Sequence, residues 1–135
     1  MKKFHWPVRV YYEDTDSGGV VYHANYLKYF ERARTEYLRA MGHELDAVLR
    51  DTGVLFVVRS LTIDYLKPAV FNDALTVTAA INTLRPASLT FTQTLIRGDD
   101  LQLATAEVKV VCLKADGFRP VAIPDILLQS LKHEF

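Results

Sequence analysis

The feature that most constrains the fold is one stretch of helical periodicity, residues 23–41, in a chain patterned mainly for strands. Along this stretch apolar residues recur every three or four positions, while the opposite face is charged. Gly42 follows as a residue suited to ending a helix. We therefore expect one long amphipathic helix here and a shorter helix from Leu45 to Arg50.

Strand patterns occupy most of the remaining chain. The clearest alternation covers residues 75–82, and tight turns between successive strands favour antiparallel pairing. The expected strands are residues 8–12, 56–66, 75–82, 88–97 and 101–113, with a terminal helix over 126–131 capped by Asp125. The pattern predicts an α+β fold in one domain, residues 1–135, with a five-stranded antiparallel sheet wrapped around the long central helix.

Composition narrows the functional classes. Lys plus Arg and Asp plus Glu number 16 each, and this balance argues against a general nucleic-acid binder. No apolar run approaches the roughly 18 residues of a membrane span, and no signal-peptide apolar region follows the first lysines. Cys112, the single cysteine, lies in an apolar run and is expected to be buried, with no disulfide or zinc cluster. We expect a cytoplasmic protein without a metal.

Residues 9–26 carry the groups best suited to chemistry. They read as a strand, a turn with carboxylates and two glycines, and then a helix start. Glycines let a backbone approach a ligand, and free N–H groups of the first helical turn, expected over residues 21–24, can donate to an acyl oxygen. A carboxylate beside them could attack a thioester carbonyl or activate water. Spacing does not choose among Glu13, Asp14 and Asp16, and a helix cap alone would also explain an aspartate here.

The same segment resembles the active-site signature of a known family. Arg9-Val10, Thr15-Asp16, Gly19-Val20-Val21, His23 and Tyr26 are spaced as in the 4-hydroxybenzoyl-CoA thioesterase family, whose fold is the hot-dog. The resemblance extends over most of the chain and agrees with the fold expected from periodicity. Asp14 to Asp16, Gly19 to His23, Phe30 to Arg34 and Phe56 to Arg59 resemble the branch encoded beside the Tol–Pal envelope system.

This resemblance implies an enzyme that hydrolyses acyl-CoA to free acid and CoA without a cofactor. It assigns Asp16 as nucleophile or as general base on water, and the sequence does not separate these roles. His23 would polarise the thioester carbonyl or position water, through its imidazole or its backbone N–H. The implied substrate contacts are Gly19, Val21 and Tyr22 near the carboxylate, Arg59 on the strand after the helices, and Arg85 in a basic turn that contacts CoA phosphates.

Partners and alternatives follow from the same residues. An exposed sheet face and sheet edges need cover, and family sites form between subunits, so we expect a homotetramer or at least a dimer. A carrier-protein thioester is an alternative substrate, and acyl-chain length is not predicted. Two alternative functions remain: a hot-dog dehydratase and a non-catalytic binder of acyl carriers or an envelope complex. The Thr15-Asp16-x-x-Gly19 pattern counts against the first, and intact spacing around Asp16 counts against the second.

Overall fold

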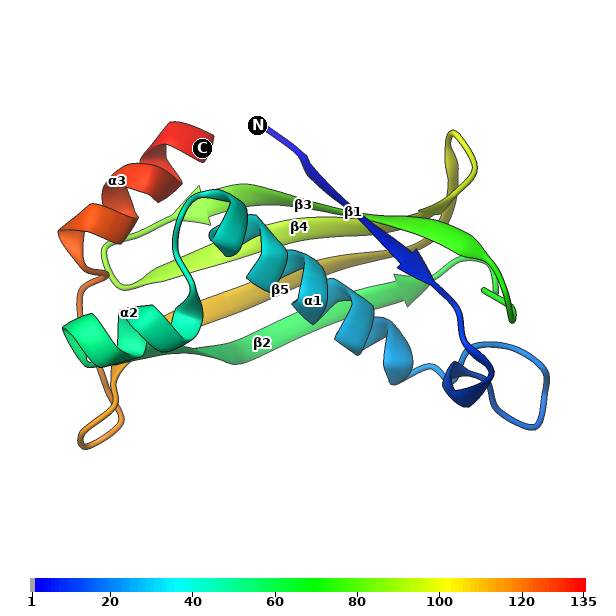
Figure 1. Ribbon diagram of the computed structural model, residues 1–135, viewed down its shortest axis with the longest axis horizontal. Coiled ribbons are helices and arrows are strands. Elements are labelled where there is room, and N and C mark those ends of the chain that lie inside the picture. Colours follow the sequence, from blue (N-terminus) through cyan, green and yellow to red (C-terminus); the bar gives the residue numbers. More distant parts are fainter. Residues whose placement is uncertain (1) are drawn as a thin grey trace.

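A curved antiparallel sheet holds one long helix on its concave face in the computed structural model, which describes residues 2–135 (Figure 1). The expected α+β class is confirmed. The elements are β1 (Phe4–Arg9), the 3-10 turn η1 (Tyr12–Asp14), α1 (Asn25–Ala40), α2 (Leu45–Thr52), β2 (Val54–Tyr65), β3 (Ala74–Leu84), β4 (Ser88–Arg97), β5 (Leu101–Lys114), the two-residue β6 (Arg119–Pro120) and α3 (Asp125–Glu134).

The strand order in the sheet is β1-β3-β4-β5-β2, with β6 paired to β5, and every pairing is antiparallel. Neighbours in sequence pair in β3, β4 and β5, as tight turns require. β2 instead pairs with β5 at the far edge, although β3 follows it in the chain. The connection 66–73 carries the chain across the sheet, and on the way Val70 forms a bridge with Val20.

The first strand begins and ends earlier than the sequence predicted. It covers Phe4–Arg9 and pairs with β3 from Phe4 opposite Ala79 to Arg9 opposite Ala74. Pro7 lies within it because β1 is an edge strand, where a missing N–H costs no ladder bond on the open side. The chain then leaves the sheet, so the predicted end of this strand at Tyr12 is wrong: Tyr12 begins η1.

The helix boundaries also differ from the predicted ones. α1 begins at Asn25, not at residue 23, and it ends in a Schellman motif, in which Gly42 N–H donates to Arg39 O (2.9 Å) and His43 N–H to Leu38 O (2.9 Å). Gly42 has φ +92°, as expected of a glycine that ends a helix. Asp125 lies inside the first turn of α3 and makes no capping hydrogen bond, so its predicted cap role is wrong.

The core lies between α1 and the sheet. The apolar face of α1 is buried through Tyr26, Tyr29, Phe30, Ala33, Tyr37 and Leu38. One buried amide, Gln93 of β4, fixes the helix on the sheet: its Nε2 donates to Phe30 O (3.0 Å), and Arg34 Nη1 donates to its Oε1 (2.9 Å). This docking leaves the start of α1 and residues 10–24 at one end of the molecule, with α2 and α3 at the other (Figure 1).

The bounds predicted for the last two long strands agree closely with the structure. β4 has the predicted bounds, β5 extends one residue further than predicted, and Cys112 of β5 is fully buried. Among residues 2–135 no helix is both long and apolar enough to span a membrane.

Candidate active site

The loop between β1 and α1 is folded back on itself, with Asp16 near its tip. Asp16 N–H donates to Val20 O (2.9 Å) and Tyr22 N–H to Asp14 O (2.9 Å), which pairs the two arms of the loop. Gly19 has φ +80°, a conformation that strains any residue with a side chain, so this glycine serves the turn. At the spacing of extended chains, the Asp16 backbone lies roughly 10 Å from that of His23. The carboxylate loop therefore leads directly into the helix start.

The hydrogen bonds of the loop distinguish its three carboxylates. Both oxygens of Asp14 accept bonds, Oδ2 from Tyr11 N–H (2.8 Å) and Oδ1 from Asn25 Nδ2 (3.0 Å). Asp16 Oδ1 accepts only Gly18 N–H (2.8 Å), and among residues 2–135 nothing bonds to its Oδ2. Glu13 is exposed and has no hydrogen bond within the described chain. Asp16 is thus the carboxylate that is both held in place and left with a free oxygen.

Gly18 has a steric reason to be glycine. A Cβ at this position would lie 3.2 Å from Asp16 Oδ1, closer than most such contacts. The two glycines therefore have different roles: Gly18 makes room for the carboxylate that bonds to its own N–H, and Gly19 turns the chain. Neither role depends on a ligand, although both hold Asp16 in place.

The unused backbone donors are two of the four N–H groups that the sequence predicted, although these groups precede the helix and do not lie in its first turn. Because α1 begins at Asn25, residues 21–24 precede the helix, and two of their N–H groups are used. Val21 N–H donates to Ala69 O (2.8 Å) and Tyr22 N–H to Asp14 O. Within residues 2–135 no hydrogen bond uses the N–H of His23 or Ala24. These two groups, at the positive end of the helix dipole, are the unused donors among residues 21–24.

Aromatic side chains surround the start of α1. The exposed His23 ring lies 4.6 Å from that of Tyr22 and 6.4 Å from that of Tyr65, measured between ring centroids. Tyr65 Oη donates to His23 O (2.8 Å), and burial raises the pKa of Tyr65. Tyr65 was not predicted as a site residue, and it lies 42 residues from His23 in the sequence, at the end of β2. Nothing in the strand pattern marks it as part of the site.

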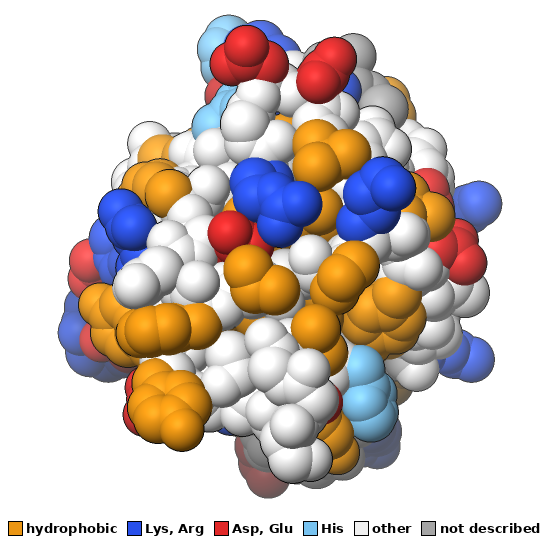
Figure 2. Space-filling view, turned by 90° about the vertical axis from the view of Figure 1, so that its right-hand side faces the viewer, with side chains coloured by type: hydrophobic (Ala, Val, Ile, Leu, Met, Phe, Trp, Pro, Cys, Tyr) orange, Lys and Arg blue, Asp and Glu red, His pale blue; other side chains and the backbone are white. Residues whose placement is uncertain are grey.

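This end of the molecule carries a broad hydrophobic surface. Figure 2 views it directly and shows apolar side chains gathered among polar ones. Tyr12 is 79% exposed and Phe71 50%, and their rings are 5.8 Å apart. Tyr22 is 46% exposed, whereas the side chain of Val21 is buried in the core. A surface of this kind is typical of an interaction site.

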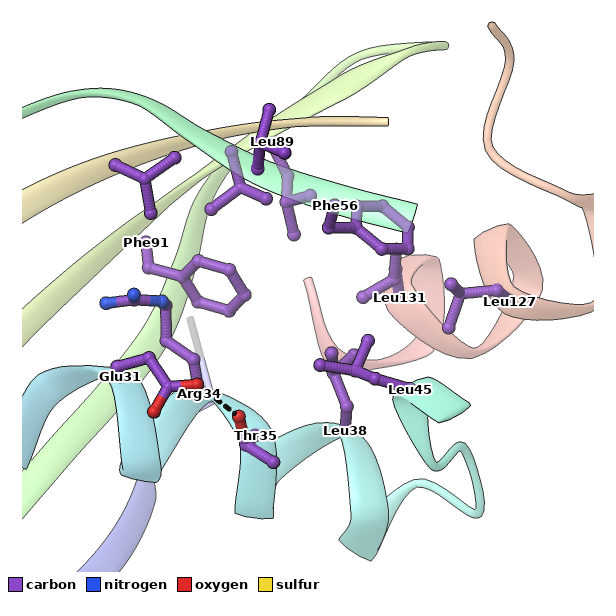
Figure 3. Close-up of a pocket in the computed structure, with 13 residues that line it drawn as sticks. Glu31, Arg34, Thr35, Leu38, Leu45, Phe56, Leu89, Phe91, Leu127 and Leu131 are labelled. Carbon is purple, nitrogen blue, oxygen red and sulfur yellow. Dashed lines mark hydrogen bonds between the residues drawn. The ribbon is translucent and has the colours of Figure 1, made fainter. Parts of the chain in front are cut away.

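The protomer also contains a cavity whose lining does not include Asp16. This cavity of about 120 Å³ lies between α1, the sheet and α3 (Figure 3). Leu38, Phe56, Phe91, Leu127 and Leu131 form most of its apolar lining. Asp16 itself is exposed to solvent. This cavity therefore includes neither Asp16 nor the substrate contacts Gly19, Val21 and Tyr22 that the resemblance implied.

Polar groups occupy one side of that cavity. Glu31, Arg34 and Thr35 project from α1, and the Thr35 hydroxyl donates to Glu31 Oε1 (3.0 Å; Figure 3). Burial lowers the pKa of Arg34, although nearby Glu31 opposes the shift. The volume approaches the roughly 150 Å³ of a cavity known to admit benzene, so the space suits a ring-sized apolar group.

The two predicted arginines lie outside the loop that carries Asp16. Arg59 is exposed at a bulge in β2, where the register with β5 shifts between Val58 and Ser60. Arg85 lies in the β3–β4 turn, exposed, and its N–H donates to Ser88 O (2.8 Å). β3 has 11 residues, so about 35 Å separates this turn from the end of the sheet that holds Asp16 (Figure 1). One protomer therefore does not bring Arg85 and Asp16 together.

Within the described chain, no three or more His, Cys, Asp and Glu residues are grouped to hold a metal ion. The fold and the loop together define a hot-dog protein with a partly free carboxylate at the entrance to its central helix. The chain belongs to the thioesterase superfamily, whose family model matches residues 18–104. That match includes His23, Arg59 and Arg85 and begins two residues after Asp16.

Individual relatives agree with this membership. The acyl-CoA thioester hydrolase YbgC of Escherichia coli O6:H1 is 45% identical over 129 residues, 96% of each chain. A probable thioesterase from Bartonella henselae is 34% identical, with a TM-score of 0.84 over 90% of this chain and 99% of that one. A mutant of 4-hydroxybenzoyl CoA thioesterase, solved with 4-hydroxybenzoyl CoA, is 19% identical and shares the fold, with a TM-score of 0.90 over 97% and 99% of the two chains. The resemblance found in the sequence is confirmed.

Proposed function

We propose that this protein hydrolyses acyl-CoA thioesters to the free acid and CoA, with Asp16 as nucleophile or general base. The observation that carries the assignment to Asp16 is its free carboxylate oxygen, in the loop that leads to the unused N–H groups of His23 and Ala24. The reaction class is supported by relatives named acyl-CoA thioester hydrolase and acyl-CoA thioesterase at 45% identity over nearly the whole chain.

In this mechanism the thioester carbonyl oxygen accepts hydrogen bonds from the N–H groups of His23 and Ala24. As a nucleophile adds, negative charge gathers on that oxygen, and each backbone donor stabilises it by roughly 2.7–4 kcal/mol. Asp16 either attacks the carbonyl carbon, forming a mixed anhydride that water then hydrolyses, or takes a proton from the attacking water. Either route breaks the C–S bond and consumes one water, and the proton that this water releases passes to the departing CoA thiolate, directly or through Asp16, so that the free acid and CoA remain and Asp16 is again a carboxylate.

The decisive experiment is Asp16→Asn, assayed by release of the CoA thiol. We expect turnover to fall by at least about 100-fold, the scale of a principal catalytic group, with an unchanged circular dichroism spectrum. Glu13→Gln is the matched control, since Glu13 is in the same loop and bonds to nothing within residues 2–135, and it should keep wild-type activity. Near-normal turnover in a folded Asp16→Asn variant would reassign the chemistry.

The other predicted site residues support the loop or contact the substrate. Gly19 and Val21 support the loop through the turn and the core, and Tyr22 offers an exposed ring beside His23. Arg85 binds CoA phosphates in a site that another subunit completes, since a guanidinium suits phosphate and Asp16 of its own protomer is out of reach. Arg59 lines the site or a subunit contact.

The proposed reaction uses no cofactor. A panel of acyl-CoA and acyl-carrier thioesters, scored by kcat/KM, would identify the acyl group.

We also propose a homodimer or tetramer in which β2 is the paired edge. The two sheet edges differ: β1 has six residues and contains Pro7, whereas β2 has 12 residues and exposes Val58 and Leu61. A long open edge with exposed apolar residues favours pairing with a second chain. Leu61→Asp should lower the mass measured by light scattering, while His5→Asp on β1 should not. A monomeric wild-type mass at micromolar concentration would contradict this.

For the cellular setting we propose the cytoplasm and an association with the Tol–Pal system. The support is the resemblance of the Asp14 to Asp16 and Phe30 to Arg34 runs to that branch, and one buried, unpaired thiol suits a reducing compartment. Cell fractionation tests the first proposal. For the second, a pull-down with Asp16→Asn should recover the same envelope partners as the wild type, and recovery of none by either protein would exclude the association.

A further inference from the structure

We propose that Asp14 is a positioning residue that sets the distance between the Asp16 carboxylate and the free N–H groups at the start of α1. The inference rests on the proposed function, since it assigns Asp14 a role in the same reaction. Asp14 touches neither substrate nor reacting atoms and acts through the geometry of the loop.

The contacts of Asp14 join three parts of the chain. Its Oδ2 accepts the Tyr11 N–H (2.8 Å) just after β1, and its Oδ1 accepts Asn25 Nδ2 (3.0 Å) at the first residue of α1. Its own carbonyl oxygen accepts the Tyr22 N–H (2.9 Å) from the returning arm of the loop. One residue thereby fixes the beginning of the loop, its return and the helix entrance together.

The placement of these contacts connects them to the reaction. Asp14 precedes Asp16 by two residues, and Asn25 directly follows the two residues, His23 and Ala24, whose N–H groups are unused. The Asp14–Asn25 bond is therefore the side-chain link between the arm that carries the carboxylate and the arm that carries the donors. A shift of about 1 Å between reacting groups can cost on the order of 100-fold in rate.

A chemical role for Asp14 is disfavoured by the same bonds. Both of its oxygens are engaged with the chain, whereas Asp16 Oδ2 is free of any partner within residues 2–135. A positioning role makes a different demand on the side chain: it needs one acceptor for Tyr11 and one bond to Asn25, not a negative charge. An asparagine can meet this demand. Its side-chain oxygen can accept from the Tyr11 N–H, and its side-chain amide can donate to Asn25 Oδ1 once the Asn25 amide group has rotated by about 180°.

The test compares two substitutions of Asp14 in the full chain with the same acyl-CoA substrate. Asp14→Ala removes both side-chain bonds and should lower kcat by at least about tenfold while KM stays within about twofold. Asp14→Asn should recover most of the lost kcat. Asp16→Asn, which makes the same chemical change two residues away, should stay inactive. Unchanged kcat in Asp14→Ala, or an Asp14→Asn variant as impaired as Asp14→Ala, would overturn the proposal.

A swapped pair covers the case in which Asp14→Ala does not fold. Asn25→Asp places two carboxylates against each other and should lower kcat, and the double variant Asp14→Asn with Asn25→Asp restores a donor–acceptor pair and should regain it. Failure of the double variant to exceed Asn25→Asp would overturn the positioning role. Hydrogen exchange at Tyr11 and Tyr22 gives a readout independent of activity and should quicken in Asp14→Ala. Wild-type inactivity on every acyl-CoA would instead refute the proposed function.

Discussion

At the scale of single residues, Cys112 shows how burial changes chemistry away from the site. Its thiol is fully buried in β5, and burial raises its pKa to about 11. In the unfolded chain the thiol ionises near its ordinary value of 9.0, so between about pH 9 and 11 only the folded state keeps the proton. Folding stability is therefore lost as pH rises through this window, by at most about 2.7 kcal/mol for a two-unit shift.

Denaturant titrations at several alkaline pH values measure this loss. The stability of Cys112→Ala should fall less steeply between about pH 9 and 11 than that of the wild type, whatever constant difference the smaller side chain introduces. A thiol reagent should leave the native protein unlabelled at neutral pH and label it after denaturation. Rapid labelling of the native state would mean that β5 opens. Equal pH slopes in the two proteins would exclude Cys112 as the cause.

Tyr29 allows a second prediction at this scale. Its hydroxyl is the one buried side-chain polar atom within residues 2–135 that lacks a hydrogen-bond partner, and burial, with the nearby Asp14 carboxylate, raises the pKa of Tyr29. Tyr29→Phe removes a desolvated group without leaving another unpaired, so the free energy of unfolding should stay the same or rise by up to about 1 kcal/mol. A loss of about 1 kcal/mol or more on denaturant unfolding would show that Tyr29 bonds to Asp14 in solution.

The sequence located the candidate loop but could not rank its carboxylates. Glu13, Asp14 and Asp16 fit the same spacing, and the features that separate them are hydrogen bonds from Tyr11 and Asn25 to Asp14 and from Gly18 to Asp16. Those bonds depend on how the loop folds back, which no residue pattern records. The resemblance to a family selected Asp16 instead. The structure adds the physical difference between the three side chains.

At the scale of elements, the C-terminal end of α1 tests the preference for glycine at the left-handed position that ends a helix. Gly42 has φ +92°, and apart from its chain neighbours no residue has an atom within 4 Å of where its Cβ would be, so the cost of an alanine here comes from backbone strain. Gly42→Ala should lower the free energy of unfolding by about 1–2 kcal/mol in denaturant titrations. Gly42→Asn should cost less because asparagine tolerates left-handed conformations. Equal losses for the two would point to a side-chain clash.

An element was predicted correctly where its apolar–polar alternation and the turn residues at its two ends indicated the same boundaries. β4 alternates between buried and half-buried positions and is bounded by turns, and its predicted range was correct. β1 was placed four residues late because its pairing with β3, and not its own composition, decides where it begins. The bulge that leaves Arg59 outside the β2–β5 register has no sequence signal either. Strand boundaries that depend on pairing with another strand therefore cannot be predicted from the strand's own sequence.

At the scale of the whole molecule, the fold separates the two ends of the proposed substrate. Asp16 and the free N–H groups lie at one end of the sheet, and Arg85 lies at the other, about 35 Å away along β3. The sequence named both residues but could not place them at opposite ends, because that distance follows from strand length and direction. If both act on one acyl-CoA, the Arg85 involved must belong to another subunit.

This separation predicts complementation between inactive and impaired subunits. Alone, Asp16→Asn should lack activity and Arg85→Glu should have a raised KM for acyl-CoA, because like charges repel at the phosphate site. In mixed oligomers, an Asp16 from the Arg85→Glu subunit meets an intact Arg85 from the other. When the two variants are co-expressed and the mixed oligomers are purified through two different tags, their kinetics should therefore show a component with the wild-type KM, which neither variant has alone.

The double variant mixed with wild type is the control for stoichiometry. Absence of that component in verified mixed oligomers would mean that Arg85 plays no part in a shared site.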